Sequence, residues 1–393
     1  MKTYVYIFLF FLLGVTTSAL GSNGNVSDNM TSGGEDPLAH PAYQRLLDAI
    51  EKYEDIKDEG GWPSISEDIG VLNKGQSSEY IPMIRERLAI SGDLPEGEAG
   101  TDKDLYDDAL ALAVGEFQLR HGLQVDGIIG PETIKEMNVP VEDRIEQMKF
   151  SVDSWKDLPE ELGEKYVFVN VPEFRLQAFS GKDVELEMRV VVGEEYNGRE
   201  TPTFSDSISY LEFNPYWNIP HSIVQRTILP QAKEDLGYLE MNNYEIVDSF
   251  FEDTATVLPT TAENLDRVEN EELFIRQRPG PTNSMGLVKF MFPNEYAIYL
   301  HDTPADHLFD VRERTFSNGC IRVEKPAELA KYLLENAKGE WDLARIWNEK
   351  QNGDRKIVTL QDKIPIYIIY WTAFVDEDGT INFRPDIYNE QDV

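Results

Sequence analysis

KYVFVNVPEFRLQAF (residues 165–179) and KDVELEMRVVVG (residues 182–193) are the two stretches that decide the fold of this chain. Their apolar residues, many of them β-branched, alternate with polar ones or form short runs, which is the pattern of a strand. Ser180 and Gly181 stand between the stretches and are typical turn residues. The sequence therefore predicts antiparallel strands from residue 165 onward.

More strand patterns follow toward the C-terminus, in SISYLEFNPYWNIP (207–220), GLVKFMFPNEYAIYLHDT (286–303) and PIYIIYWTAFVDEDGTINFRP (365–385). The last predicts a strand, an Asp-rich turn that closes at Gly379, and a second strand. Residues 221–280 instead have a helical and loop composition, and KPAELAKYLLENA (325–337) predicts a helix. We therefore expect an α+β fold in which a mainly antiparallel β domain, residues 164–393, carries an inserted, mostly helical subdomain at 221–280.

Before the sheet the chain has the helical period. YQRLLDAIEKY (43–53) predicts an N-terminal helical segment at residues 41–64, and YIPMIRERLAISG (80–92) predicts a helix that stops at Gly92. YDDALALAVGEFQLRHGLQVDGIIGPETIKEMN (106–138) continues the stripe, turns at VDGIIG and restarts at Pro131. These patterns predict a small α-helical domain, residues 65–150, ahead of the β domain.

Composition narrows the class of protein. A chain of 393 residues is long enough for two domains, at on the order of 100–200 residues each. Its 41% of hydrophobic residues predict a globular protein. The 36 basic residues face 72 acidic ones, and the resulting net charge of −36 repels phosphate backbones. Nucleic acid is therefore excluded as an expected partner.

The N-terminus has the pattern of an export signal. Lys2 precedes YVYIFLFFLLGV (4–15), and TTSA (16–19) offers small residues for cleavage. An apolar run of 12 is shorter than the roughly 20 residues of a spanning helix. We expect a signal peptide at 1–20, a flexible Gly/Ser/Asn tether at 21–40, and an exported protein. The alternative is an uncleaved membrane anchor formed by residues 4–15.

Cys320 is the only cysteine of the chain. In an oxidising compartment a structural cysteine usually has a partner, so a lone one is either an inert buried residue or a reactive thiol. His301 lies 19 residues upstream (320 − 301) at the end of a predicted strand, and Cys320 follows the polar turn formed by Ser317, Asn318 and Gly319. A strand end and a tight turn can bring imidazole and thiol together as base and nucleophile.

Two further features of this region bear on its chemistry. Gly319 lets the backbone approach a substrate closely, and the N–H of Cys320 can then face a developing oxyanion. A metal site formed by His301, Asp302 and His307 is the alternative use of the histidines. The chain has neither HExxH nor a second histidine cluster, so we predict no metal and no other cofactor, and we expect His307 on the surface.

The motifs around Cys320 resemble the active-site signature of the L,D-transpeptidases, the family with a YkuD-type catalytic domain. The matching segments are FNPYWN (213–218), NSMGLVKF (283–290), YLHDTP (299–304), SNGCIRV (317–323) and YWTAFVDEDGTINFRPDIY (370–388). They are most similar to the large periplasmic branch, which has a capping insertion. FQ (117–118), HGL (121–123), DGIIGPET (126–133) and MN (137–138) resemble its peptidoglycan-binding module. Together the resemblance covers most of residues 65–390.

The resemblance implies a role for each matched residue. Cys320 is the expected nucleophile and His301 its base. The hydroxyl of Tyr299 is expected to complete the oxyanion hole with the Cys320 N–H. Arg322 is expected near the thiolate, where a cation favours ionisation, and Trp217 in the substrate groove under the cap.

The polar turn is the second part of the implied site. Ser317, Asn318 and Gly319 are expected to contact substrate. The commoner signature has histidine directly before the glycine, and Asn318 stands there in this chain. Asn318 cannot act as a second base.

The implied activity is acyl transfer in the cell envelope or periplasm. Cys320 attacks the bond between the third and fourth residues of a tetrapeptide stem, releases D-alanine, and the thioester passes to an amine of a neighbouring stem, which gives a 3→3 cross-link. The expected partners are these donor and acceptor stem peptides of peptidoglycan. The inserted residues 221–280 are the expected lid. Hydrolysis, attachment of a wall protein, cleavage of unrelated peptides and a non-catalytic peptidoglycan-binding role are the alternatives.

Overall fold

The structure is a computed structural model that describes residues 36–95, 102–196, 198–250 and 254–391. The predicted signal peptide, the alternative anchor at 4–15 and most of the predicted tether lie outside these residues. Within the described ranges, no helix has both the length and the apolar character needed to cross a membrane.

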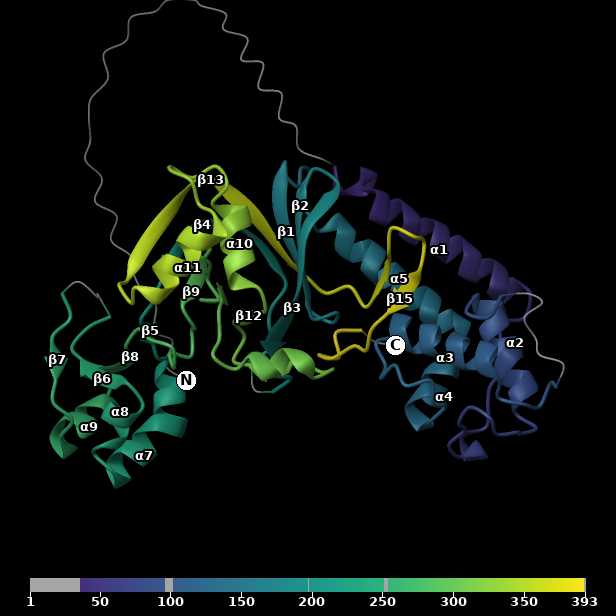
Figure 1. Cartoon of the computed structure of the whole chain (residues 1–393), viewed down its shortest axis with the longest axis horizontal. Helices are drawn as coiled ribbons and strands as arrows, with labels where there is room; N and C mark the ends of the chain where they lie inside the picture. The colour runs from purple at the N-terminus through teal and green to yellow at the C-terminus, as the bar shows by residue number, and fades with distance from the viewer. Residues whose placement is uncertain (1–35, 96–101, 197, 251–253, 392–393) are drawn as a thin grey trace, which may run out of the picture. The chain divides into compact units, whose positions relative to one another are not determined.

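A nine-stranded sheet organises the C-terminal part of the chain (Figure 1). Its order is β11-β3-β12-β10-β9-β4-β13-β1-β2, and β3 also pairs with β2. Pairing is antiparallel except between β1 and β13, β10 and β12, and β11 and β3, so the predicted mainly antiparallel α+β fold is confirmed. The bounds are β1 Lys165–Asn170, β2 Arg175–Ser180, β3 Asp183–Gly193, β4 Phe204–Phe213, β9 Val288–Met291, β10 Leu300–His301, β11 Thr315–Ser317, β12 Ile321–Val323 and β13 Lys356–Ile369.

Several strand boundaries differ from the prediction, among them the end of the strand expected at 207–220, which is β4 ending at Phe213, and two of the differences have a local cause. The stretch 165–179 is not one strand: the chain reverses between β1 and β2, which pair antiparallel from Asn170 opposite Arg175. The reversal contains Pro172, which has no N–H to give to a ladder, and Phe174 with φ of 56°. Strand β13 begins at Lys356 rather than at residue 365. Its register with β4 shifts between Thr359 and Ile364, which interrupts the alternation on which the prediction relied.

Each face of the sheet is buried against helices. Alternate residues of β1 show this, because Val167 belongs to one apolar core and Phe168 to the other. Helices α10 (Pro326–Leu333) and α11 (Leu343–Gln351) contribute to the first core. Helices α1 (Pro41–Asp58) and α5 (Val141–Lys156) cover the second, where Trp155 stacks on Trp371 with ring centroids 4.3 Å apart. Helix α5, which no sequence pattern had indicated, runs without a break through residue 150.

Helices α2 (Ile81–Ser91), α3 (Asp108–Arg120) and α4 (Pro131–Met137) form a small unit with its own apolar core. Gly92 ends α2 with φ of 88°, as predicted, because glycine adopts this left-handed conformation without a Cβ clash. Pro131 begins α4, also as predicted.

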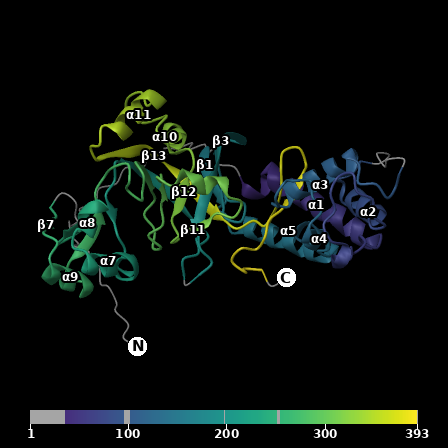
Figure 2. The same ribbon diagram turned by 60° about the horizontal axis from the view of Figure 1, so that its bottom comes forward.

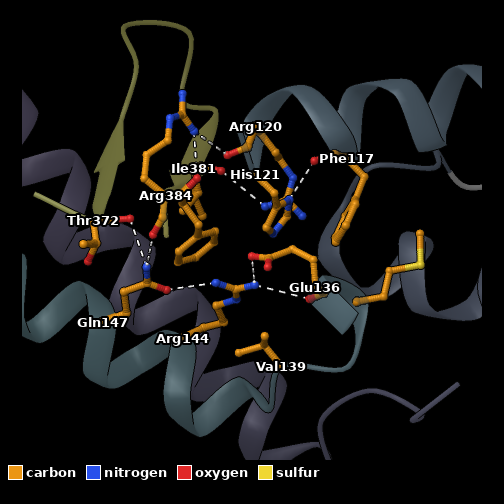
Figure 3. A network of polar contacts seen from close by, with 12 residues as sticks. Phe117, Arg120, His121, Glu136, Val139, Arg144, Gln147, Thr372, Ile381 and Arg384 are labelled. Carbon is orange, nitrogen blue, oxygen red and sulfur yellow. Dashed lines mark hydrogen bonds and ion pairs between the residues drawn. The ribbon is translucent and has the colours of Figure 1, made fainter. Parts of the chain in front are cut away.

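The helical unit contacts a C-terminal hairpin of strands β14 (Ala373–Val375) and β15 (Ile381–Phe383) (Figure 3). Arg120 Nη1 donates to the carbonyl of Ile381 at 3.2 Å, and Arg384 Nη1 donates to the carbonyl of Arg120 at 3.0 Å. From α5, Gln147 Nε2 donates to the carbonyls of Thr372 and Arg384 at 3.1 and 2.9 Å.

Figure 3 also shows how this contact extends into α5. Arg144 Nη1 donates to Gln147 Oε1 at 2.9 Å. His121 stacks between Phe117 and Phe383 at centroid distances of 3.8 and 5.4 Å, and burial holds its pKa well below the ordinary range. A neutral imidazole and the hydrogen bonds of Arg120, Arg384 and Gln147 fix the helical unit on the hairpin, since breaking such contacts leaves buried polar groups without partners.

Residues 221–280 form a subdomain, here called the cap, with its own apolar core. Figure 2 shows its helices α7 and α9 side by side, and both contribute to this core. Its four-stranded sheet, β5-β8-β6-β7, was not predicted, because strands of two to four residues are too short to display a period. Strand β5, Trp217–Asn218, precedes residue 221 and completes this sheet. The elements of the cap itself are α6 His221–Ile223, a π-helical turn Val224–Ile228, α7 Leu229–Glu234, α8 Tyr238–Met241, β6 Tyr244–Val247, β7 Val257–Leu258, α9 Ala262–Glu269 and β8 Phe274–Gln277.

Candidate active site

Strands β10 and β12 position the candidate residues. They pair in parallel with His301 opposite Arg322, and the N–H of Ile321 donates to the carbonyl of Tyr299 at 3.1 Å. Tyr299 precedes β10 as Cys320 precedes β12, so these two residues are also opposite each other. Residues two apart on a strand share a face. The pairing therefore gathers Cys320, Tyr299, His301 and Arg322 on one side of the sheet.

His301 is a buried histidine with a defined tautomer. Its Nδ1 lies 2.5 Å from the carbonyl oxygen of Asp302. A carbonyl oxygen only accepts hydrogen bonds, so Nδ1 carries the proton and Nε2 keeps its lone pair. Burial lowers the pKa of His301 to about 3, and the Arg322 cation also lowers it. The imidazole is therefore neutral at neutral pH and can accept a proton at Nε2.

Asp302 holds the backbone to which His301 donates. Its carboxylate accepts from the N–H groups of Leu287 and Thr303 at 2.9 and 2.8 Å. Lys350 Nζ, from α11, lies 3.2 Å from Asp302 Oδ2, and both side chains are buried. Gly286 faces this carboxylate with φ of 61°, and a Cβ there would come within 2.4 Å of Asp302 Cβ. The strand end that presents His301 is thus fixed by a buried ion pair.

Cys320 is partly buried, and its Sγ lies 3.8 Å from the carbonyl oxygen of Ala297. Burial raises the pKa of the thiol, although Tyr299 and the cations of Lys289 and Arg322 act to lower it. Among the described residues no hydrogen bond joins Sγ to His301. The thiol is therefore mostly protonated at neutral pH, and an attack by sulfur requires that its proton be removed.

The turn before Cys320 is built on glycine. Gly319 has φ of 105°, and a Cβ there would lie 3.0 Å from Ile298 Cδ1. Its N–H donates to the Ser317 hydroxyl at 3.1 Å, and its carbonyl accepts from the Thr201 hydroxyl at 2.9 Å. The first contact lies within the turn and the second ties the turn to Thr201, and together they fix the backbone that leads to the Cys320 N–H.

The structure places the other expected residues as follows. Tyr299 packs on the sheet core, and burial raises the pKa of its phenol, so the hydroxyl remains a hydrogen-bond donor. Asn318 Oδ1 accepts from Arg226 Nη2 of the cap at 3.3 Å. Trp217 is half-buried and packs against the cap core, and no described hydrogen bond or ring contact joins it to β10 or β12. His307 is exposed, as expected.

Sequence reasoning missed four residues of this region: Thr201, Arg226, Lys289 and Lys350. Lys289 stands opposite His301 on β9, and its Nζ lies 4.2 Å from the centroid of the Tyr299 ring. Strand alternation within the segment NSMGLVKF predicts the face of the sheet on which Lys289 lies, but not which residue of another strand lies beside it. Thr201, Arg226 and Lys350 are far from Cys320 in sequence, and no local pattern connects them to it.

Two segments of the chain match known protein families. Residues 164–356 match the family model described as "L,D-transpeptidase catalytic domain", of the YkuD family. The chain carries an L,D-transpeptidase catalytic domain. Residues 77–137, ahead of the transpeptidase domain, match the model described as "Putative peptidoglycan binding domain".

A protein of Haemophilus influenzae named "Putative L,D-transpeptidase" is 34% identical over 223 residues. The match covers 56% of this chain and 44% of that protein, so the chain spans less than half the length of this relative.

Two solved L,D-transpeptidases also align with the chain. The structure from Stackebrandtia nassauensis is 14% identical, with 78% of this chain and 96% of that one covered and a TM-score of 0.27. The structure from Mycobacterium smegmatis is 11% identical, with 52% and 58% covered and a TM-score of 0.24. Scores this low add nothing to the arrangement described above.

The raised pKa of Cys320 predicts how the transpeptidase domain reacts with a thiol reagent. Alkylation by iodoacetamide proceeds through the thiolate, so its rate is expected to be low at pH 7 and still to rise above about pH 9. Intact mass after timed quenching, between pH 5 and pH 10, measures the rate at this single cysteine, with glutathione as the reference thiol. A plateau already reached below about pH 7 would contradict the description, because it would indicate a preformed thiolate.

Proposed function

We propose that this chain is a cysteine-dependent L,D-transpeptidase that forms 3→3 cross-links in peptidoglycan. The observation that carries the proposal is the pairing of β10 with β12, which sets Cys320 opposite Tyr299 and His301 opposite Arg322 within a transpeptidase domain. Cys320 is the nucleophile, His301 the general base, and Tyr299 a donor to the oxyanion.

The first half-reaction forms a thioester. Sγ of Cys320 attacks the carbonyl between the third and fourth residues of the donor stem while Nε2 of His301 takes the thiol proton. The Tyr299 hydroxyl and the Cys320 N–H stabilise the tetrahedral oxyanion. The C–N bond then breaks, and His301 returns the proton to the departing amine of D-alanine. A neutral, oriented imidazole suits both steps, because it is unprotonated before attack and needs no reorientation.

The second half-reaction forms the cross-link. An amine of a neighbouring stem attacks the thioester, His301 takes the amine proton, and the C–S bond breaks as the Cys320 thiol is reprotonated. The cap, residues 221–280, screens the thioester from water and so favours the amine. If water attacks the thioester instead, the protein is an L,D-carboxypeptidase. If an amine of a wall protein attacks it, the protein attaches that wall protein to peptidoglycan.

The remaining parts of the chain fit an enzyme of the cell envelope. A signal peptide at residues 1–20 directs export, and the tether at 21–40 follows it. The helical unit at residues 77–137 matches a peptidoglycan-binding model, and its buried contacts with the C-terminal hairpin support a unit that moves with the catalytic domain. Peptidoglycan is therefore both the surface that the protein holds and the substrate.

The test uses residues 36–393 and disaccharide-tetrapeptide, with the Cys320→Ala variant alongside. Mass spectrometry of the products is expected to show dimers lighter than two monomers by one alanine, and none with the variant. If tripeptide monomer were the sole product, the reaction would be hydrolysis rather than transpeptidation. An unchanged donor would contradict catalysis and leave a peptidoglycan-binding protein.

A further inference from the structure

A row of polar and charged side chains crosses the sheet at the candidate site. In register on β4, β9, β10 and β12 stand Glu212, Lys289, His301 and Arg322. Paired residues on neighbouring strands project to the same face. His301 is therefore flanked by a lysine on one strand and an arginine on the other, next to Cys320. This concentrates positive charge in a protein whose net charge is −36.

Arg322 has a buried side-chain nitrogen without a hydrogen-bond acceptor. Its Nη2 donates to the carbonyl of Phe316 at 3.3 Å, but its buried Nε has no hydrogen-bond partner in the described part of the chain. It also forms no ion pair with any described carboxylate. A buried guanidinium nitrogen without an acceptor is costly, and a ligand oxygen would satisfy it.

Arg226 brings a second guanidinium to the site from the cap. It lies in the π-helical turn and is exposed, and its Nη2 donates to the neutral Asn318 side chain, two residues before Cys320. Among the described residues it has no carboxylate partner. Three other arginines of the cap, by contrast, are each paired with an acid: Arg267 with Glu272, Arg276 with Glu245 and Arg278 with Glu240.

We propose that Arg226 and Arg322 bind a carboxylate of the donor stem peptide and make a free carboxylate close to the scissile bond a requirement for acylation. This rests on the proposed function. A guanidinium binds a carboxylate with charge-assisted, often bidentate hydrogen bonds, which are stronger than the bond to an amide oxygen. The donor carboxylate therefore replaces Asn318 as the partner of Arg226 and draws the cap onto the occupied site.

Two carboxylates of a stem meet this description: the terminal one on the leaving residue, and a side-chain one on the residue whose carbonyl is attacked. Three donors distinguish them, namely the free acid, its C-terminal carboxamide and its side-chain carboxamide. An alaninamide is less basic than alanine and leaves more readily, so slower acylation of the C-terminal carboxamide reports lost recognition rather than weaker leaving-group chemistry.

The measurement is kcat/KM for Cys320 acylation, by acid quench and intact mass, with the wild type and the Arg226→Gln and Arg267→Gln variants. Arg267→Gln makes the same charge change in the same subdomain, and thermal unfolding reports whether each variant is folded. We expect one carboxamide to be acylated about tenfold or more slowly by the wild type. Arg226→Gln is expected to lower kcat/KM for the free acid about tenfold and to reduce the difference in kcat/KM between the acid and the amide. Arg267→Gln is expected to keep the wild-type kcat/KM and the wild-type difference.

Each other outcome overturns the inference. The first such outcome is equal rates on all three donors in the wild type. The second is a loss in Arg226→Gln that is equal on acid and amide donors, and the third is an equal loss in Arg267→Gln. Each means that these arginines do not recognise a carboxylate. Failure of the proposed function looks different, since then no donor forms an adduct on Cys320 in any variant.

Discussion

Replacing His301 with glutamine is expected to lower the rate of Cys320 acylation by about 10²–10⁴-fold, the usual contribution of a general base. The reason lies in two features of the native residue: burial keeps the imidazole neutral, and the Asp302 carbonyl fixes its proton on Nδ1. Glutamine has no basic nitrogen with which to take the thiol proton. The measurement is the rate of thioester formation with disaccharide-tetrapeptide at pH 7.

His307→Gln is the matched control, because His307 lies six residues away (307 − 301) and is exposed. It is expected to keep the wild-type rate. If His301→Gln retained more than about a tenth of the wild-type rate, another base would have to take the thiol proton. The pH profile separates the cases, since in the wild type the base stays unprotonated down to about the pKa of His301, near 3.

Asp302→Ala is expected to destabilise the protein by about 3–5 kcal/mol, as the loss of one partner of a buried ion pair does. The substitution leaves the Lys350 ammonium buried without its carboxylate, and the N–H groups of Leu287 and Thr303 without an acceptor. Urea unfolding followed by tryptophan fluorescence measures the change. Acylation is expected to fall as well, because His301 donates to this same backbone.

Two controls accompany this variant. Asp153→Ala removes an acid from the exposed pair with Lys156 and is expected to leave the unfolding midpoint unchanged. Adding Lys350→Met to Asp302→Ala removes the unpaired charge and is expected to restore a large part of the stability. If the single and double variants were equally unstable, the cost would come from the lost backbone hydrogen bonds rather than from Lys350.

The parts of the fold that sequence predicted are those that local patterns determine. The period-two segments gave the antiparallel sheet, and the helical stripe with Gly92 and Pro131 gave the ends of α2 and α4. The reversal at residues 171–174 was missed because apolar residues continue through the turn. The sheet of the cap was missed because its strands are too short to show alternation.

The candidate site likewise contains residues that local patterns predict and residues that they do not. Cys320 and His301 could be selected because a lone thiol and a histidine at a strand end are chemically conspicuous. Thr201 and Lys350 reach the site only through tertiary contacts, with the Gly319 carbonyl and with Asp302. Strand register, which local patterns do not determine, set Lys289 beside His301. The catalytic roles stay predictions until they are tested.

The most direct test of thioester catalysis at Cys320 is the intact mass of the protein, residues 36–393, quenched in acid within its first turnovers on disaccharide-tetrapeptide. A covalent adduct equal to the donor minus alanine is expected, located on Cys320 by peptide mapping. It is absent from Cys320→Ala and after treatment with hydroxylamine, which cleaves thioesters. An unmodified Cys320 while products accumulate, or an adduct on any other residue, would contradict thioester catalysis at Cys320.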